Sequence, residues 1–558
     1  MSKEKFLKNY LKIASHLGLC CLMVAVSACN LGMSGEEDST LDNFPKTENW
    51  WTGKIFYTVL VRSFYDSNGD GIGDLKGVQQ KLDYLNDGNP STNSDLGVTA
   101  LCLLPVFSSV KYDGSDVLNY REVHPDLGTA EDLKDLVAAA HLRGMKVVIG
   151  LELNHTSSQH PWFKESSLTA DSPKRKWYVW SNINPGFTDS FGRTVWHPSE
   201  FGFYYGYYGP EKPDLNYREN AVTAEIKNLV SFWYDEASVD GFRMGSAGLL
   251  IEEDKNLAQT KSTLEWWRKF YPFQRNLDPA LLTIGEIFSS TEGLVPFSGE
   301  KLDFCMEYSL SESIIESIVA GSNLPIRRKL TEVVNTLPNQ QFGVLLSDHN
   351  RQRVSSIFDG EGRRAKAAAT LMLTLPGIPH VYYGEEIGMK GGDREVEVRT
   401  PMQWSSDINA GFSSATPWFP VKSDYGNINV RSQIDDSTSV FQHYRRLIGF
   451  RNSFTALQNG YYELVNTSNA SLFAFLRTGN KESFLVIQNL SGESIREPQL
   501  SIIDGSLGVG AYQTTELQSG KTFSILRVNQ GGSFSSFVPA AEVAPYQSII
   551  LKLMPRLE

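Results

Sequence analysis

Several short apolar runs of this 558-residue chain end in polar side chains that could carry chemistry. The segments share a position at or just after such a run: Leu153-Asn154-His155, Gly241-Phe242-Arg243, Gly285-Glu286 and Asp348-His349-Asn350. Carboxyl, imidazole and guanidinium groups transfer protons and bind the hydroxyl or charged groups of a ligand. Taken singly, His155 and His349 also fit satisfied core histidines, and Arg243 fits a buried ion pair. Whether these polar residues form a functional site depends on whether the fold brings them together.

Eight strand-like runs with helical stretches between them account for most of the chain. They cover residues 55–61, 98–104, 146–153, 241–244, 281–287, 302–306, 342–346 and 378–383. Strands that alternate with helices predict an α/β fold, and eight of them predict a closed parallel barrel, the (β/α)8 TIM barrel. Enzymes of this architecture carry their chemistry at the carboxyl ends of the strands, so we expect the polar segments to meet there.

Two further units accompany the barrel, which should span residues 48–455. Residues 155–214 are too long for a simple loop and rich in Trp, Tyr, Gly and Pro, which predicts a subdomain inserted after the third strand. After about Asn459, short alternating strands separated by turn residues predict a C-terminal all-β sandwich over residues 460–558.

The composition is that of an acidic globular protein, with a net charge of −12 and a sequence pI near 5.4. Binding to nucleic acid needs clustered Lys and Arg that displace counterions, so we expect no nucleic-acid partner. Cys102 and Cys305 each lie inside an apolar run, which predicts buried free thiols rather than a disulfide framework.

The first 29 residues have the pattern of a targeting segment. Three early lysines precede an apolar stretch that ends in Val26-Ser27-Ala28-Cys29, and small residues directly before a cysteine resemble the bacterial lipoprotein processing box. Cys29 would then be the acylated N-terminus, residues 30–47 a flexible tether, and the protein a lipid-anchored membrane lipoprotein of the bacterial cell envelope, on the periplasmic side or the cell surface. An ordinary cleaved secretion signal is the alternative. No later stretch is apolar for the roughly 20 residues that span a bilayer.

In order and spacing, the polar segments resemble glycoside hydrolase family 13, the α-amylase family, and most nearly its oligo-1,6-glucosidase and α-glucosidase branch. The resemblance runs from about Trp50 to the C-terminus and includes three further motifs: Asp66-Ser67-Asn68-Gly69-Asp70-Gly71-Ile72-Gly73-Asp74, Gly377-Ile378-Pro379 through Tyr383-Gly384-Glu385-Glu386, and Arg399-Thr400-Pro401-Met402-Gln403-Trp404. It implies a barrel protein of α-glucan or α-glucoside metabolism.

The resemblance assigns catalytic roles to three positions, and only one of them carries a carboxyl group here. The family's general acid/base maps onto Glu286, its nucleophile onto Gly245, and the transition-state carboxylate that closes its Asn-His-Asp motif onto Asn350. Retaining glycosidases need two carboxyl groups roughly 5 Å apart, so hydrolysis by this route should be lost or strongly impaired. Gly150 and Ser115 also replace a family Asp and Tyr.

Other residues match family positions that contact the sugar ring: Asp116, His155, Arg243 and His349. Because positions 150 and 245 lack carboxylates, we expect the buried guanidinium of Arg243 to need water, ligand or another anion. Aromatic residues of the insert could add stacking platforms, although half or more should pack the subdomain itself.

The acidic loop after the first strand could be mistaken for an EF-hand, but its twelfth position is Gly77 rather than the required Glu. The resemblance implies instead one structural calcium ion, held by Asp66, Asn68, Asp70, Asp74 and the carbonyl of Ile72. A merely polar turn is the alternative.

Three functions stay open. The first is a membrane-anchored pseudoenzyme that binds α-glucosides or maltooligosaccharides without cleaving them. The second is an active hydrolase or transglycosylase that recruits a substitute carboxylate; Asp348 and Glu152 are candidates, although we expect neither where the fourth-strand nucleophile attacks. The third is a scaffold for a protein partner that binds no sugar, analogous to the amylase-like heavy chains of amino-acid transporters.

Overall fold

The computed structural model describes residues 49–92, 94–337, 341–392 and 394–556. The predicted signal segment, Cys29 and the tether of residues 30–47 lie outside the described residues. Within the described ranges, no helix is long and apolar enough to cross a membrane.

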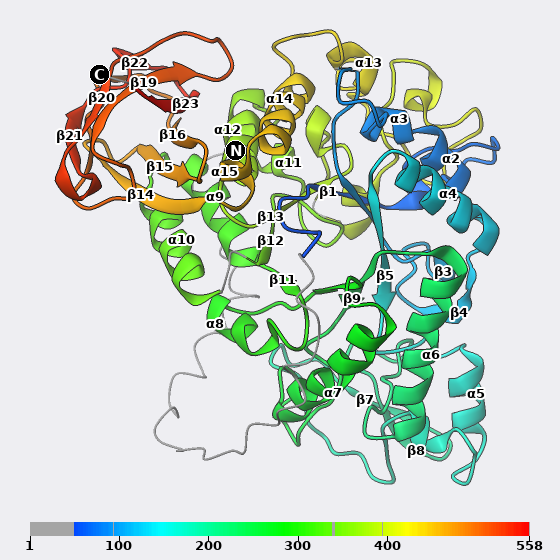
Figure 1. Ribbon diagram of the computed structural model, residues 1–558. Helices are drawn as coiled ribbons and strands as arrows, with labels where there is room; N and C mark the ends of the chain where they lie inside the picture. Colours follow the sequence, from blue (N-terminus) through cyan, green and yellow to red (C-terminus); the bar gives the residue numbers. More distant parts are fainter. Residues whose placement is uncertain (1–48, 93, 338–340, 393, 557–558) are drawn as a thin grey trace, which may run out of the picture.

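Eight parallel strands close into a barrel (Figure 1). In chain order they are β1 (Phe56–Val59), β2 (Ala100–Leu103), β5 (Lys146–Glu152), β9 (Gly241–Gly245), β10 (Leu282–Gly285), β11 (Phe304–Met306), β12 (Phe342–Leu345) and β13 (Ile378–Tyr382). The order around the barrel follows the order along the chain, and β1 pairs with β13 to close it. Each of the eight predicted runs corresponds to one of these strands, so the predicted (β/α)8 barrel is confirmed.

Helices separate the strands and cover the outside of the barrel (Figure 1). They are α2 (Leu75–Gln80), α3 (Leu82–Leu85), α4 (Ala130–Leu142), α6 (Asn220–Ala237), α7 (Lys261–Leu277), α8 (Thr291–Leu294), α9 (Tyr308–Ala320), α10 (Leu324–Thr336), α11 (Val354–Ile357), α12 (Gly362–Thr374), α13 (Val430–Gln433), α14 (Val440–Ser453) and α15 (Thr455–Asn459). Helix α4 begins with a capping box: the Thr129 side chain accepts the backbone N–H of Asp132, and the Asp132 side chain accepts the backbone N–H of Thr129.

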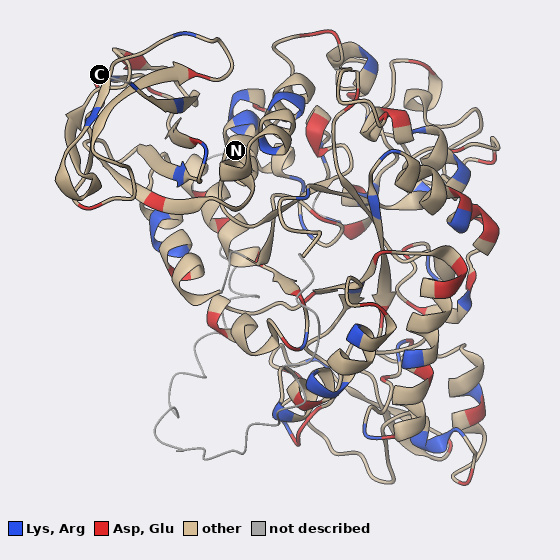
Figure 2. Cartoon of the chain, viewed as in Figure 1, with Lys and Arg blue, Asp and Glu red and all other residues tan. Residues whose placement is uncertain are grey.

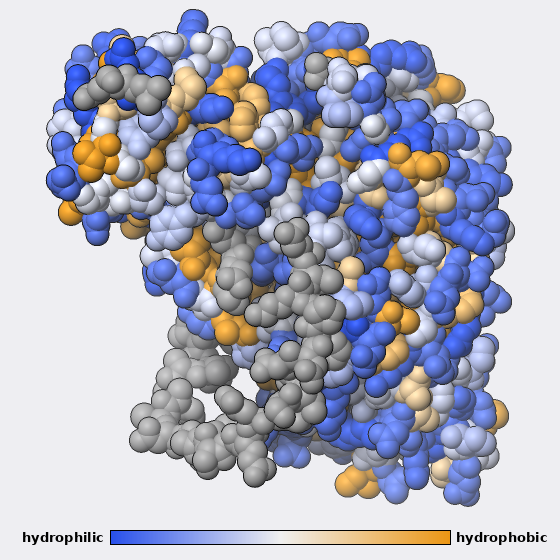
Figure 3. Space-filling view, in the orientation of Figure 1, coloured by the Kyte–Doolittle hydropathy of each residue, from blue (hydrophilic) through white to orange (hydrophobic). Residues whose placement is uncertain are grey.

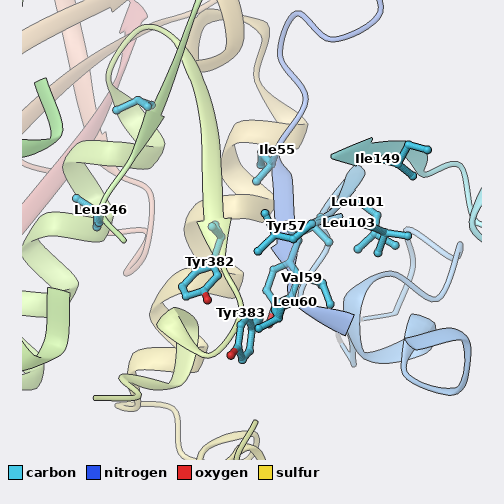
Figure 4. Close-up of a cluster of buried hydrophobic side chains, with 14 of the residues drawn as sticks. Ile55, Tyr57, Val59, Leu60, Leu101, Leu103, Ile149, Leu346, Tyr382 and Tyr383 are labelled. Atoms are coloured by element: carbon cyan, nitrogen blue, oxygen red, sulfur yellow. The ribbon is translucent and has the colours of Figure 1, made fainter. Parts of the chain in front are cut away.

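Side chains of the barrel strands alternate between two apolar layers because successive residues of a strand point to opposite faces. Ile55, Tyr57 and Val59 of the first strand region join the large core outside the strands, together with Leu101 and Leu103 (Figure 4). A second cluster gathers the alternate positions of the strands: Phe56, Ala100, Cys102, Val148, Leu282, Ile284, Phe304, Met306, Leu345 and Ile378. Cys102 and Cys305 are buried free thiols, as predicted.

The pairing of β5 with β9 decides which inward positions meet near the carboxyl end of the barrel. Val148 of β5 belongs to the inner cluster, so Gly150 and Glu152 share its face. In the strand register, Gly150 pairs with Arg243 and Glu152 pairs with Gly245. Glu152 and Gly245 are therefore direct neighbours at the last pairing of these two strands.

Short strands and one helix form the predicted insert after the third barrel strand. It contains α5 (Pro161–Leu168) and an antiparallel sheet in the order β6 (Trp180–Ser181), β8 (Gly202–Tyr205), β7 (Trp196–Ser199). Trp196, Tyr204 and Tyr205 are buried within it, whereas Tyr208 is 41% exposed. A hairpin of β3 (Phe107–Ser109) and β4 (Val117–Val123) follows the second barrel strand.

The C-terminal region is an antiparallel all-β domain, which confirms the predicted class. Its strands are β14 (Tyr461–Thr467), β15 (Leu472–Thr478), β16 (Ser483–Asn489), β17 (Ile495–Arg496), β18 (Leu500–Ile502), β19 (Gly510–Glu516), β20 (Leu526–Val528), β21 (Phe534–Phe537), β22 (Glu542–Val543) and β23 (Ser548–Pro555). Eight of them form one sheet in the order β20, β19, β23, β16, β15, β14, β18, β21, and its end strands β20 and β21 contact each other. The predicted sandwich is thus one curled sheet around an apolar core. Ser548 Oγ donates to Thr370 Oγ1 of α12 at 2.9 Å and so ties this domain to the barrel.

The surface is mixed in charge and mostly hydrophilic on the face in view. Basic and acidic residues are both spread over the outer helices in Figure 2. Apolar residues are scattered in small groups over the same face in Figure 3.

Candidate active site

Glu286 directly follows strand β10 and is buried, with 8% of its surface exposed. Arg243 Nε donates to its Oε2 at 2.8 Å, and Asn350 Nδ2 donates to its Oε1 at 3.3 Å. Burial raises the pKa of Glu286, while Arg243 opposes that rise. A buried carboxyl group that keeps its proton to higher pH suits the general acid predicted from the sequence.

Arg243 has found a carboxylate partner despite the glycines at positions 150 and 245. Its ion pair with Glu286 is buried, with 3% and 9% of the two side chains exposed. Glu286 is therefore the other anion that the sequence led us to expect beside Arg243. Among the described residues, Arg243 Nη2 is buried and has no hydrogen-bond partner.

Asn350 joins His349, Glu286 and Arg399 into one polar group. Its Nδ2 lies 3.0 Å from His349 Nε2, and its Oδ1 accepts a bond from Arg399 Nη2 at 3.1 Å. Burial, followed by Arg243 and Arg399, lowers the pKa of His349 well below its usual range. The imidazole is neutral at physiological pH, so it can donate to or accept from a sugar hydroxyl.

The space next to Gly245 is filled by the side chain of Glu152. A Cβ atom on Gly245 would lie 1.8 Å from Glu152 Oε1, 2.4 Å from its Cδ and 2.7 Å from its Oε2. These separations are shorter than any nonbonded contact, so Glu152 stands where the side chain of an aspartate at 245 would begin. The sequence did not indicate that Glu152 lies directly beside residue 245. The strand register makes Glu152 and Gly245 neighbours.

Glu152 is a weakly partnered carboxyl group in this position. Ser246 Oγ donates to its Oε2 at 3.3 Å. Burial raises the pKa of Glu152 to about 7, and the nearby Glu286 adds to this rise, while Lys212 opposes it. Within the described part of the chain, Glu152 forms no ion pair at salt-bridge distance.

The second vacated carboxylate position, Gly150, is also filled by a neighbour. A Cβ atom there would lie 2.8 Å from Cδ and 3.0 Å from N of Pro105. An aspartate at position 150 would therefore require the segment around Pro105 to move.

Asp116 and His155 lie in the loops after the second and third barrel strands, and neither contacts Glu286 directly among the described residues. His155 Nε2 bonds the carbonyl of Ser115 at 2.8 Å, and Asp116 Oδ1 accepts the backbone N–H of Lys111 at 2.7 Å. Burial, followed by Lys212, lowers the pKa of His155 to about 3, so this imidazole is neutral. Burial raises the pKa of Asp116.

Tyr208 links His155 to the carboxylate pair. Its ring lies 5.3 Å from the ring of His155 in an edge-on arrangement, and its hydroxyl lies 3.0 Å from Ser246 Oγ. Ser246 in turn contacts Glu152. Direct contacts thus join Glu286, Arg243, His349 and Asn350, and this chain joins His155 to Glu152, whose carboxyl group is coupled to Glu286 by electrostatic repulsion.

Sequence reasoning missed the roles of Lys212, Ser246 and Arg399. Lys212 Nζ donates to Ser115 Oγ at 2.8 Å, at the position where the family has tyrosine. Arg399 belongs to a motif used for the resemblance, which was a signal for its place in the site. Lys212 lies in the insert, where nothing in the sequence indicated contact with the barrel.

The acidic loop of residues 66–74 is held by its own hydrogen bonds. Asp66 accepts the backbone N–H groups of Asn68, Gly69 and Gly71, and Asp74 accepts those of Ser67 and Gly77. The oxygen donors of Asp66, Asn68, Asp70, Asp74 and Ile72 suit calcium chemically. However, no group of three His, Cys, Asp or Glu side chains within the described residues is gathered closely enough to hold a metal. Calcium stays a prediction that this geometry does not require.

Comparison with known proteins agrees with the geometry. The family model "Alpha amylase, catalytic domain" matches residues 58–460. Alpha-amylase 3 of Dictyoglomus thermophilum is 34% identical over 452 residues, covering 80% of this chain and 86% of that protein. The oligo-1,6-glucosidase of Parageobacillus thermoglucosidasius is 31% identical over 517 residues, covering 79% of this chain and 90% of that protein. The solved alpha-amylase from H.orenii has a TM-score of 0.78 and 33% identity, covering 89% of this chain and 99% of that one. The chain therefore belongs to the α-amylase family of glycoside hydrolases.

Proposed function

We propose that the carboxyl end of the barrel binds a glucosyl unit of an α-glucoside or maltooligosaccharide, and that hydrolysis through residue 245 is strongly impaired. One observation carries the proposal: at the strand ends, hydrogen bonds connect the buried pair Arg243 and Glu286 to Asn350 and His349, which are accessible to a ligand. Relatives named alpha-amylase and oligo-1,6-glucosidase support an α-glucoside as the ligand.

The polar groups of the site have the properties that binding of a neutral sugar needs. His155 and His349 are neutral because burial lowers the pKa of each, so they offer hydrogen bonds without the cost of burying a charge. Asp116 supplies an acceptor for hydroxyl groups. The exposed ring of Tyr208 lies against His155 and offers a stacking face at the entrance.

Gly245 has no side chain, so β9 supplies no nucleophile in the family's position. Removing a covalent nucleophile should raise the barrier by several kcal/mol, at ~1.4 kcal/mol for each tenfold loss of rate. Glu286 keeps the carboxyl group of the general acid, so the group missing from the family's catalytic pair is the nucleophile.

Calorimetric titration with maltose, isomaltose and maltotriose tests the binding proposal. We expect binding of at least one sugar, and we expect Asp116→Ala to weaken it tenfold or more. Asp235→Asn is the matched control, because Asp235 is an exposed carboxylate near the end of α6, before β9 begins. If none of the sugars binds at millimolar concentration, the scaffold hypothesis replaces this proposal.

We further propose that Cys29 carries a lipid that anchors the mature protein in a bacterial envelope membrane. The support is the sequence Val26-Ser27-Ala28-Cys29 after an apolar stretch. Mass spectrometry of the native N-terminus should find an acylated Cys29. An unmodified N-terminus at another residue would remove the membrane from this proposal.

A further inference from the structure

The carboxyl group of Glu152 lies beside the glycine at position 245. Ordinary bond lengths place the carboxylate oxygens of an aspartate about 2.4 Å from its own Cβ. The two oxygens of Glu152 lie 1.8 and 2.7 Å from the point where the Cβ of residue 245 would stand. Glu152 therefore places a carboxylate from the neighbouring strand in the space around the Cβ position of residue 245, at distances like those of an aspartate's own carboxylate.

The surroundings of Glu152 do not explain it as a stabilising residue. Its hydrogen bond to Ser246 is long, at 3.3 Å, and Arg243 donates to Glu286 rather than to Glu152. Burial of a carboxyl group near a second carboxyl group, without a cation in contact, costs folding free energy. Such arrangements are typical of functional sites.

We propose that Glu152 acts as the catalytic nucleophile in place of residue 245, with Glu286 as the acid and base, so that the protein is a slow retaining α-glucosidase. This inference rests on the proposed binding of α-glucosides at the same site. It also makes the glycine at 245 necessary, because any side chain there would collide with Glu152.

The reaction would proceed in two balanced steps. A carboxylate oxygen of Glu152 forms a bond to the anomeric carbon of the glucosyl unit while the bond to the leaving oxygen breaks, and Glu286 gives its proton to that oxygen. The product is a β-glucosyl ester on Glu152. Water then attacks the anomeric carbon and gives a proton to Glu286, which releases α-configured glucose and restores the carboxylate of Glu152.

The contacts of Glu286 explain why turnover should be slow. Arg243 favours the ionised form of Glu286, and repulsion between the two carboxylates then favours the protonated form of Glu152. The reactive form has the opposite distribution, with Glu152 ionised and Glu286 protonated. Glu286 and Asp113 hold the pKa of Glu152 up, while Lys212 and Ser246 oppose them. The pair must keep one proton to react, and Glu152 holds that proton up to about pH 7, so we expect kcat/KM to fall as the pH rises through about 7.

Covalent labelling tests the inference without depending on a variant that folds. The protein would be incubated with 5-fluoro-α-D-glucosyl fluoride, an activated glucosyl donor whose ester intermediate breaks down slowly. We expect the mass of one 5-fluoroglucosyl group on the peptide that contains Glu152. Labelling of a different residue would overturn the inference.

Kinetics on p-nitrophenyl α-glucoside complete the test. Glu152→Gln should lose at least 100-fold in kcat while its Kd for maltotriose stays within threefold, and Asp235→Asn should keep both values. Glu152→Asp, which keeps the carboxyl group one methylene shorter, should keep part of the activity. NMR should show an α-anomeric product; a β-anomeric product, or sugar binding without turnover or label, would overturn the nucleophile role while binding stands. Absence of sugar binding would instead refute the proposed function.

Discussion

Replacing Gly245 by aspartate is the obvious repair of the family pattern, and the structure predicts that it fails alone. A Cβ at position 245 would meet Glu152 Oε1 at 1.8 Å and Cδ at 2.4 Å, so the side chain of Glu152 must leave its position. The strand register still holds the two residues side by side. Two carboxylates about 4 Å apart repel by about 4 kcal/mol at an effective dielectric constant of 20. Protonation of one of them relieves part of this cost at low pH.

We therefore expect Gly245→Asp to destabilise the protein by about 2–4 kcal/mol at pH 8 and by less at pH 5.5. Adding Glu152→Val removes both the collision and the second charge. The double variant should regain most of the lost stability, which corresponds to a coupling energy of about 2 kcal/mol or more between the two positions. Urea denaturation of the wild type, both single variants and the double variant measures this coupling.

Activity provides the second readout of the same four proteins. Hydrolysis of p-nitrophenyl α-glucoside should be at least tenfold faster in the double variant than in Gly245→Asp, because a carboxylate then stands on β9 with no competitor in its space. If Gly245→Asp alone is as stable as the wild type at pH 8, Glu152 does not occupy this space in solution. If the double variant is no more active than either single variant, residue 245 is not the position that matters.

Three further changes test other parts of the site. Burial raises the pKa of Glu152 from 4.5 to about 7, so ionisation of Glu152 destabilises the folded protein increasingly as the pH rises through that range. Glutamine cannot ionise. The free energy of unfolding of Glu152→Gln should therefore exceed that of the wild type by about 2–3 kcal/mol at pH 8 and by little at pH 4.5. A stability difference that is equal at both pH values would contradict the raised pKa. Gly150→Asp should destabilise the protein by about 1–3 kcal/mol in urea denaturation because its Cβ meets Pro105, and a neutral effect would show that this segment yields easily. Exhaustive chelation should lower the Tm if the loop of residues 66–74 holds calcium, and an unchanged Tm with no metal by elemental analysis would leave the loop a hydrogen-bonded turn.

The sequence predicted the barrel because the signal for each strand is local. A run such as residues 146–153 is apolar, short and bounded by polar residues, and eight repeats of strand and helix leave few other architectures. The positions of Glu286, His349 and Asn350 followed from the same pattern, since the carboxyl ends of parallel strands share one end of a barrel.

The partners of Arg243 and Glu152 could not be predicted in the same way. Residues 152 and 245 are neighbours only through the register of two strands that are separated by the insert and α6. A glycine that replaces a family carboxylate also gives no sign in the sequence of whether another side chain fills the space beside it. Arg243 bonds Glu286 for a related reason: with glycine at both expected partner positions, the nearest remaining carboxylate turns toward it.

The filled spaces at 150 and 245 bear on how this site departed from the family pattern. Loss of a buried carboxylate by itself leaves a void and an unpaired cation, and both are costly in a packed interior. Here Pro105 fills the space at Gly150, Glu152 fills the space at Gly245, and Glu286 pairs with the cation of Arg243. The family's Asn-His-Asp motif reads Asp348-His349-Asn350 here, so a carboxyl and an amide group have exchanged places. Asp348 Oδ1 accepts the backbone N–H of Asn350 at 2.8 Å. Each change is matched by a contact that suits it, so the site is packed as one unit. Restoring single family residues should therefore disturb it, and only paired substitutions should restore the family's chemistry.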